Sequence, residues 1–319
     1  MQKILFYCAI FIAFSGQAQK LRIGFYNVEN LFDTINDPNK NDEDFLPEGS
    51  YNWTGARYME KIKHINTVFA EMGNLLAVGV CEIENEAVIR DIIRFSPTMS
   101  KTHGVVHVES MDARGIDVGL IYDSIRLKLV SQGMIRFKLP GKEIPTSRDI
   151  LWAKFVSKKD TLHFLINHWP SRSGGQEASD PNRMEAAKNA KHYLDSVLTI
   201  QPNAKIILMG DLNDYPTNNG PKLIAESLRP QICKASGEYQ GTYFYKGEWD
   251  VLDHILVSDG LLSKKKGFKV VPNSGKILSP TYLMETFKGD LLPFRTYAGR
   301  KYLGGFSDHL PVVIDVKLR

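Results

Sequence analysis

The pattern of hydrophobic and polar positions along this chain predicts a mixture of strands and helices. Short apolar runs that end at Gly, Asn, Asp or Pro are typical of buried strands. Such runs, with the polar residues that follow or precede them, occupy residues 22–32, 75–85, 117–123, 151–156, 162–170, 205–214, 253–258 and 311–318. A loop rich in Asp, Asn, Pro and Gly is expected at residues 37–53.

Two segments show helical spacing instead. Residues 55–73 carry apolar residues three or four positions apart, and Gly73 closes the expected helix. Residues 180–198 are amphipathic, and we expect a helix that Asp180 begins, with Pro181 at its first position.

The order of these elements favours a single α+β domain built in layers. Strands and helices are mixed, and several strands follow one another directly, unlike a strictly alternating parallel fold. No internal repeat, low-complexity linker or change of composition marks a domain boundary. The composition, 43% hydrophobic and 24% charged, is that of an ordinary globular protein with an ample core.

The first nineteen residues differ from the rest of the chain. They contain one early lysine, an apolar stretch from Ile4 to Phe14, and small residues at Gly16 and Ala18. This pattern predicts a secretory signal peptide over residues 1–19, with an uncleaved N-terminal anchor as the alternative. Its removal lowers the formal net charge from +4 to +3. A mildly basic chain tolerates a polyanionic partner without requiring one.

The cysteines do not indicate a disulfide scaffold or a metal site. After the signal peptide only Cys81 and Cys233 remain, without CxxC spacing. We expect two buried thiols, and a single bridge between them is the alternative in an oxidising compartment.

Polar side chains recur where the apolar strands end or begin. Six strand ends carry a carboxylate, an amide or an imidazole: Asn27 and Glu29, Glu82 and Glu84, Asn167 and His168, Asp211 and Asn213, Asp253 and His254, and Asp308 and His309. Ligands in open sheets tend to bind at such strand ends. The repetition predicts that these ends converge on one polar site.

The residue types favour a hard divalent cation. Carboxylate and amide oxygens suit Mg²⁺, which needs only one or two protein carboxylates, and histidines beside it supply proton transfer near neutral pH. An EF-hand starting at Asp211 is excluded because Tyr215, Pro216 and Lys222 occupy positions that require an oxygen ligand, Gly and Glu. A zinc site of the HExxH or paired-cysteine type is absent from the sequence.

Taken together, six motifs resemble those of the endonuclease/exonuclease/phosphatase family. They are YNVENL, CEIEN, INHWPSR, MGDLND, LDHILVS and FSDHLPV, which stand in the family's order between residues 22 and 314. The resemblance implies a four-layered α/β/β/α sandwich of two packed mixed sheets over residues 20–319, with the site along one edge. It also implies metal-assisted attack of water on a phosphoester.

The same resemblance implies roles for the metal and for the base. Glu82 is expected to hold the metal with Asn27 close by, and Asp308 to be a second carboxylate near it. His309 is expected to activate water, oriented by Asp253, because a carboxylate fixes the imidazole tautomer and steadies its positive charge.

Further residues are expected to act on the phosphate. Asp211 and Asn213 alternate on an extended stretch and so share one face, which leaves Asp214 structural. Asp211 would position water or a proton, and Asn213 would donate to a phosphate oxygen. His168 would stabilise the phosphate or protonate the leaving group.

Substrate phosphate binding is expected from the guanidinium groups of Arg114 and Arg172. Glu29 and Glu84 are expected to be solvated or to support the site. The run of Lys264, Lys265 and Lys266 is expected to be a surface loop. The aromatic stretch of residues 242–250 is expected either to wall the site or to pack.

From these features we predict an exported, periplasmic or secreted, Mg²⁺-dependent phosphodiesterase, with Mn²⁺ or Ca²⁺ as substitutes. The first hypothesis is an endonuclease acting on nucleic acid as a monomer, with no stable protein partner. The alternatives are a sphingomyelinase-like or small-molecule phosphoesterase, and a binding platform without activity. Two loops would set the substrate: the acidic residues 37–53, and residues 286–305, which carry Arg295, Arg300 and Lys301.

Overall fold

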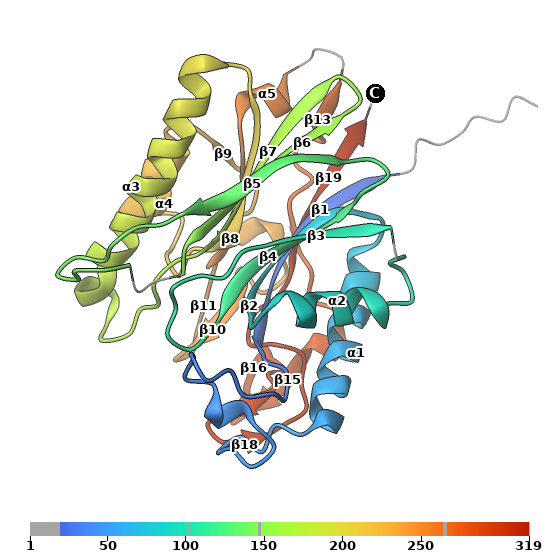
Figure 1. Ribbon diagram of the computed structural model, residues 1–319, viewed down its shortest axis with the longest axis vertical. Helices are drawn as coiled ribbons and strands as arrows, with labels where there is room; N and C mark the ends of the chain where they lie inside the picture. Colours follow the sequence, from blue (N-terminus) through green and yellow to red (C-terminus); the bar gives the residue numbers. More distant parts are fainter. Residues whose placement is uncertain (1–19, 101, 146–147, 264–266, 319) are drawn as a thin grey trace, which may run out of the picture.

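Two mixed β-sheets, packed face to face, form the centre of the molecule (Figure 1). The computed structural model describes residues 20–100, 102–145, 148–263 and 267–318. The expected signal peptide of residues 1–19 and the three lysines 264–266 therefore lie outside the described residues.

The first sheet has the strand order β13-β19-β1-β2-β4-β3, with β14 also paired to β19. Its central strands β1 and β2 are parallel, whereas β19 and β4 run antiparallel to them. The strand bounds are β1 (Leu21–Leu31), β2 (Leu75–Ile83), β3 (His103–His107), β4 (Asp117–Asp123), β13 (Phe268–Val270), β14 (Lys276–Ile277) and β19 (Val312–Leu318).

The second sheet has the strand order β5-β6-β7-β8-β12-β9 and repeats this arrangement. Its central strands β7 and β8 are parallel, and β6 and β12 run antiparallel to them. The strand bounds are β5 (Lys128–Ile135), β6 (Ile150–Ser157), β7 (Asp160–His168), β8 (Lys205–Asp211), β9 (Arg229–Pro230) and β12 (Asp253–Val257).

Helices cover the outer faces of both sheets (Figure 1). On the first sheet lie α1 (Gly55–Met72) and α2 (Glu86–Arg94), and on the second lie α3 (Gln176–Ile200) and α4 (Asn219–Ala225). A short helix, α5 (Asp259–Leu262), contacts β13 and β8. The predicted four-layered sandwich in a single domain is confirmed.

Hairpins and single turns fill the loops. The hairpins pair β10 (Tyr243–Tyr245) with β11 (Glu248–Asp250), β15 (Met284–Phe287) with β16 (Asp290–Pro293), and β17 (Tyr297–Ala298) with β18 (Lys301–Tyr302). The 3₁₀ turns are η1 (Glu43–Phe45), η2 (Lys234–Ser236) and η3 (Thr281–Leu283). No helix within the described residues is both long enough and apolar enough to span a membrane.

The alternation of side chains between the two faces of β8 explains why residues 206–209 are all apolar. Ile207 and Met209 point into the core between the two sheets, whereas Ile206 and Leu208 point into a second core beneath α3. Successive side chains of a strand face opposite sides, so a strand covered on both faces needs no polar positions. The helix α3 contributes small residues to this second core, including Ala187.

The helix ends agree with the sequence in one case and differ in the other. Thr54 caps α1 by accepting a hydrogen bond from the backbone N–H of Arg57, and Gly73 ends it with a φ of +84°. The expected start of the other helix at Asp180 was wrong, because α3 begins at Gln176 and Pro181 lies inside it. Pro181 is the sixth residue of α3, and because it has no backbone N–H the helix lacks the hydrogen bond to the carbonyl of Glu177.

The expectation about the cysteines was half wrong. Both thiols are unbridged; Cys81 is buried on β2, but Cys233 is exposed. Cys233 precedes the short turn η2 in a loop rather than a strand, so no sheet covers it.

Substitution of Gly79 by Val should destabilise the protein. Gly79 lies on β2 and faces the opposite sheet: a Cβ atom there would lie 3.0 Å from Met209 Sδ and 3.3 Å from an Ile166 methyl group of that sheet. We expect a loss of about 1–3 kcal/mol in the free energy of unfolding, measured with urea. As a matched control, Gly55→Val adds a side chain with nothing within 4 Å and should cost much less. Equal losses in both variants would contradict this account of the sheet packing.

Candidate active site

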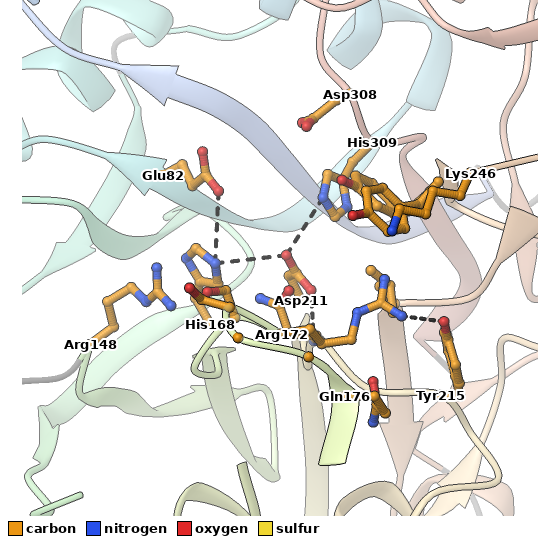
Figure 2. Close-up of a pocket in the computed structure, with 18 of the residues that line it drawn as sticks. Glu82, Arg148, His168, Arg172, Gln176, Asp211, Tyr215, Lys246, Asp308 and His309 are labelled. Carbon is orange, nitrogen blue, oxygen red and sulfur yellow. Dashed lines mark hydrogen bonds and ion pairs between the residues drawn. The ribbon is translucent and has the colours of Figure 1, made fainter. Parts of the chain in front are cut away.

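The six strand ends singled out from the sequence meet at one edge of the sandwich. The parallel pairs β1–β2 and β7–β8 end there, and their antiparallel neighbours β12 and β19 begin there. In the second sheet, Asp211 is the register partner of both His168 and Asp253. The two sheets thus bring side chains far apart in sequence to the same place (Figure 2).

A cleft of about 690 Å³ opens at this edge. It is lined by most of the residues that the sequence indicated: Glu82, Arg114, His168, Arg172, Asp211, Asn213, Asp308 and His309. Asn27 and Asp253, which are fully buried, lie behind the cleft and contact its lining.

Asn27 links the carboxylates of the two sheets. Its side-chain amide donates to Glu82 Oε1 at 3.2 Å and to Asp211 Oδ2 at 3.1 Å, while its own oxygen accepts from the backbone N–H of Glu29. The nitrogen of Asn27, not the oxygen, therefore faces the carboxylates. To ligate a metal through its oxygen, this amide would have to turn and give up the bond from Glu29.

Glu82 reaches the cleft because the backbone bends beneath it. Its φ is +59°, a left-handed conformation that is uncommon for residues other than glycine, and the pairing of β2 with β4 shifts register between Cys81 and Ile83. The backbone N–H of Asn30 donates to Glu82 Oε2 at 3.0 Å and fixes the carboxylate. Such strain in a buried strand end is typical of functional sites.

His309 is held by a buried carboxylate. Its Nδ1 lies 2.7 Å from Asp253 Oδ2, and its Nε2 lies 3.7 Å from Asp211 Oδ2. Burial alone would lower the pKa of His309, but the carboxylates of Asp253 and Asp211 outweigh it and raise this pKa well above 6.5. The charged imidazolium is therefore the favoured form at neutral pH.

His168 has the opposite electrostatic character. Its Nε2 lies 3.8 Å from Glu82 Oε1 and 3.7 Å from Asp211 Oδ2, and its Nδ1 has no hydrogen-bond partner. Burial, followed by the charges of Arg148 and Arg114, lowers the pKa of His168 well below 6.5. The two imidazoles of the site thus differ in charge at the same pH.

Asp211 and Asn213 both face the cleft, although not by the predicted geometry. The strand β8 ends at Asp211, and Asn213 has a φ of +49°, so the stretch is a turn and not extended. The backbone N–H of Asn213 donates to Asp211 Oδ1 at 2.8 Å, and its side-chain amide donates to the Trp169 carbonyl at 3.1 Å. Burial and the charge of Asp253 raise the pKa of Asp211 to about 6.

Asp214 belongs to the same turn, but it is fully buried and does not line the cleft. It accepts a hydrogen bond from the side-chain amide of Gln176 at 2.8 Å and lies 3.5 Å from the guanidinium of Arg183, which is also fully buried. These contacts attach the start of α3 to the turn after β8.

Cationic and aromatic side chains flank the carboxylates and imidazoles. Arg172 donates to the Tyr215 hydroxyl and its guanidinium lies 4.8 Å from the centre of that ring. The aromatic stretch forms a wall of the cleft, because Tyr243 and Tyr245 of β10 and Lys246 line it.

Arg148 was missed by the sequence reasoning. It lines the cleft and is almost completely buried. Its neighbour Asp149, immediately before β6, gave a possible signal, since a charged pair at the start of an apolar strand is unusual.

Asp308 lies at the rim with Arg295 of the 286–305 loop. Arg295 Nη2 lies 3.7 Å from Asp308 Oδ2, so this loop reaches the site as expected. The other cations of the loop, Arg300 and Lys301, are exposed and do not line the cleft.

Of the two expectations for Glu29 and Glu84, the structure excludes that they are solvated and leaves a supporting role. Both are buried, and Glu29 Oε2 accepts from the backbone N–H of Thr296 and lies 3.9 Å from Lys61 Nζ. Burial, together with the charge of Asp308, raises the pKa of Glu29 to about 7. Because Lys61 also donates to the Phe306 carbonyl, this pair connects β1 to the loop before Asp308.

The donor set fits a divalent cation. Glu82 and Asp211 form no salt bridge with a lysine or arginine among the described residues; their ion-pair partners are the two histidines. Burial first, then the charge of Asp308, raises the pKa of Glu82. Two carboxylates at one cleft whose ion-pair partners within the described residues are histidines are a setting in which Mg²⁺ or Mn²⁺ binds.

Substitution of Asn27 by Ala should destabilise the metal-free protein. The variant leaves the buried carboxylates of Glu82 and Asp211 without their shared donor, so we expect a loss of about 1–3 kcal/mol in urea unfolding with EDTA present. A suitable control is Asn189→Ala, which removes a local contact with Glu185 on α3 and should cost about 0.5 kcal/mol or less. Similar losses in the two variants would refute the linking role of Asn27.

Solved structures of several proteins resemble this chain. The human Nocturnin catalytic domain with bound sulfate has a TM-score of 0.58 and 15% identity, covering 94% of this chain and 95% of that one. A mannosyl-6-phosphatase of Bacteroides thetaiotaomicron has a TM-score of 0.57 and 18% identity, with coverages of 93% and 100%. TDP2 of D. rerio, complexed with a single-strand DNA product, has a TM-score of 0.58 and 14% identity, with coverages of 94% and 99%.

These similarities concern the fold, since the identities are low. No curated protein matches the sequence. The sequence itself matches the Endonuclease/Exonuclease/phosphatase family over residues 22–318. The chain therefore belongs to this family, whose enzymes are phosphoester hydrolases that depend on divalent metal ions.

Proposed function

We propose that this protein is an exported Mg²⁺-dependent phosphodiesterase that cleaves nucleic acid internally, as an endonuclease. The observation that carries the proposal is the flanking of the carboxylate and histidine cluster by cations and tyrosines within one cleft. Export rests on the composition of residues 1–19, and the N-terminal sequence of protein from the native host tests it.

Glu82 and Asp211 are the residues that would hold the metal, with Asn27 and Asp308 beside them. When bound there, a divalent cation neutralises charge on a phosphate oxygen and on the leaving oxygen. The protein supplies the rest: positioned bases, hydrogen-bond donors and a cleft that orients the substrate.

We assign activation of water to His309. Asp253 fixes the ring through Nδ1 and leaves Nε2 pointing toward Asp211, so water near Asp211 is within reach of the imidazole. Because the adjacent carboxylates favour the imidazolium, His309 accepts a proton only after it has lost its own.

His168 and Asn213 complete the surroundings of the phosphate. Neutral His168 can donate a hydrogen bond to a phosphate oxygen without adding charge, and its partnerless Nδ1 leaves both tautomers open. Asn213 lies at the turn beside it and presents its amide from the end of β8.

The choice of nucleic acid rests on the walls of the cleft. Guanidinium and ammonium groups meet phosphates, and tyrosine rings provide faces on which bases stack. Arg172, Lys246, Tyr215, Tyr243 and Tyr245 all line the same cleft.

A lipid phosphodiesterase is the second candidate. The hairpin of β15 and β16 exposes Phe287 and Leu291, two apolar side chains of the kind that insert into a membrane surface. Two residues make a small patch, and the described cleft is lined mainly by charged and tyrosine side chains. A sugar phosphatase, such as the similar mannosyl-6-phosphatase, would use the same core chemistry.

Hydrolysis assays decide between these substrates. We expect the chain from residue 20 onward to nick plasmid DNA with Mg²⁺ and to be inactive with EDTA. His309→Ala should lower the rate by about 10²–10⁴-fold, whereas His192→Ala, an exposed histidine on α3, should leave it unchanged. RNA, sphingomyelin vesicles, mannose 6-phosphate and bis-p-nitrophenyl phosphate are assayed in parallel. Activity confined to lipid or sugar phosphate would refute the endonuclease assignment.

The pH dependence tests the role of His309. As a base with a raised pKa, it is protonated at low pH and becomes competent as pH rises, so kcat/KM should increase with pH on a limb above 6.5. Asp253→Asn removes a negative charge that raises this pKa and should move the limb to lower pH while lowering the plateau. Asp259→Asn, an exposed carboxylate paired with Arg229, should leave the profile unchanged. A rate that falls over the same range would make His309 an acid instead.

A further inference from the structure

Arg148 is a buried cation without a carboxylate partner among the described residues. The residue is 7% exposed, one of its terminal nitrogens donates to the Trp169 carbonyl at 3.1 Å, and its buried Nε has no hydrogen-bond partner. The next residue, Asp149, pairs instead with Arg136 at 3.4 Å. A buried charge without an opposite charge is strongly unfavourable, so an anion is expected at this guanidinium.

Charges of both signs act on Arg148 from a distance. The carboxylates of Asp112, Glu82 and Asp211 favour its charged form and Arg114 opposes it, but no carboxylate of the described residues forms a salt bridge with Arg148, which lines the cleft with Arg114. Within the described residues, neither guanidinium forms a salt bridge with a carboxylate that lines the cleft. Arg114 pairs instead with Asp112 of its own loop, at 3.8 Å.

The place of Arg148 is beside, and not within, the cluster of carboxylates and imidazoles. Figure 2 shows it on the far side of His168 from Asp211 and His309, and away from Arg172 and Tyr215. The Trp169 carbonyl that accepts from Arg148 also accepts from the amide of Asn213 at 3.1 Å. Arg148 therefore lies next to the residues that we assign to the scissile phosphate, but it is not one of them.

Cations thus stand on two sides of the reacting centre, Arg148 on one and Arg172 and Lys246 on another. A phosphomonoester or a small diester has one phosphate and would leave one side unfilled. A nucleic-acid strand carries a phosphate at every nucleotide and would fill both.

We infer that Arg148, with Arg114 beside it, forms a subsite for a second phosphate, the one adjacent to the scissile phosphate in a nucleic-acid strand. The inference rests on the proposed function and narrows its substrate to strands that carry a phosphate next to the bond that is cut. Arg148 lines the cleft, and a terminal nitrogen of its guanidinium is the group available for this contact.

Dinucleotides with one cleavable bond test the subsite. We compare thymidylyl-thymidine with its 5′-phosphorylated and 3′-phosphorylated forms, using the wild-type enzyme with Mg²⁺. One phosphorylated form should have a kcat/KM about tenfold higher than the unphosphorylated dinucleotide, as expected for one charge-assisted hydrogen-bonded contact, and its identity shows which side Arg148 serves. Equal values for all three substrates would overturn the inference.

Variants assign this preference to Arg148. We take the ratio of kcat/KM for the preferred phosphorylated dinucleotide to kcat/KM for the unphosphorylated one. In Arg148→Met this ratio should fall toward one. Arg148→Lys keeps the charge but loses the planar fork, so it should retain part of the preference. Arg136→Met, an exposed arginine on the loop beside β6, should keep the wild-type ratio. An unchanged ratio in Arg148→Met would overturn the inference, and circular dichroism checks that each variant folds.

A binding measurement keeps the subsite testable if the protein does not cleave nucleic acid. Thymidine 3′,5′-bisphosphate carries two phosphates at nucleotide spacing, and we expect wild-type protein to bind it about tenfold more tightly in calorimetry than either monophosphate. Arg148→Met should lose this difference. If wild-type protein prefers the bisphosphate, Arg148→Met loses this preference, and no nuclease activity is found, the two-phosphate subsite stands and the endonuclease assignment is rejected. Equal affinities for the bisphosphate and the monophosphates in the wild type would reject the subsite itself.

Discussion

Two carboxylates that share one amide donor organise the site of this protein; Asp211 is buried and Glu82 is partly buried. Glu82 ends a strand of the first sheet and Asp211 ends a strand of the second, and Asn27 donates to both. Carboxylates in such proximity repel each other, and burial makes the repulsion stronger. The imidazolium of His309 compensates part of this charge, and a divalent cation bound there would compensate more, so the electrostatic constraint on the fold also suits it to phosphate chemistry.

The architecture of the sheets is what allows these carboxylates to meet. Each sheet has a central parallel pair, and the antiparallel neighbour of each pair begins where the pair ends. In each sheet, two adjacent strand ends therefore lie between strand starts along a single edge. The close packing at Gly79 holds the sheets together just inside this edge and limits how far the two halves of the site can separate.

Local electrostatics gives chemically similar residues of the site different charge states and contacts. His309 is kept charged by Asp253 and Asp211, whereas burial and two arginines keep His168 neutral. The arginines differ in the same way: Arg172 stacks on Tyr215 at the surface of the cleft, while Arg148 is buried with only a backbone carbonyl to bind. A substrate with a single phosphate would contact one of these guanidinium groups, and the proposed subsite for a second phosphate would use the other.

Much of this could be predicted from the sequence, because the relevant signals are local. Continuous apolar runs such as residues 205–209 required burial on both faces, and polar residues directly after them had to lie at a sheet edge. Family motifs added the four-layered fold. Tertiary structure alone decided that Glu29 is buried against Lys61, that Asn213 faces the cleft through a turn, and that Arg148 has no carboxylate partner among the described residues. These features depend on contacts between segments far apart in the chain, and periodicity reports only which face of an element is covered, not what covers it.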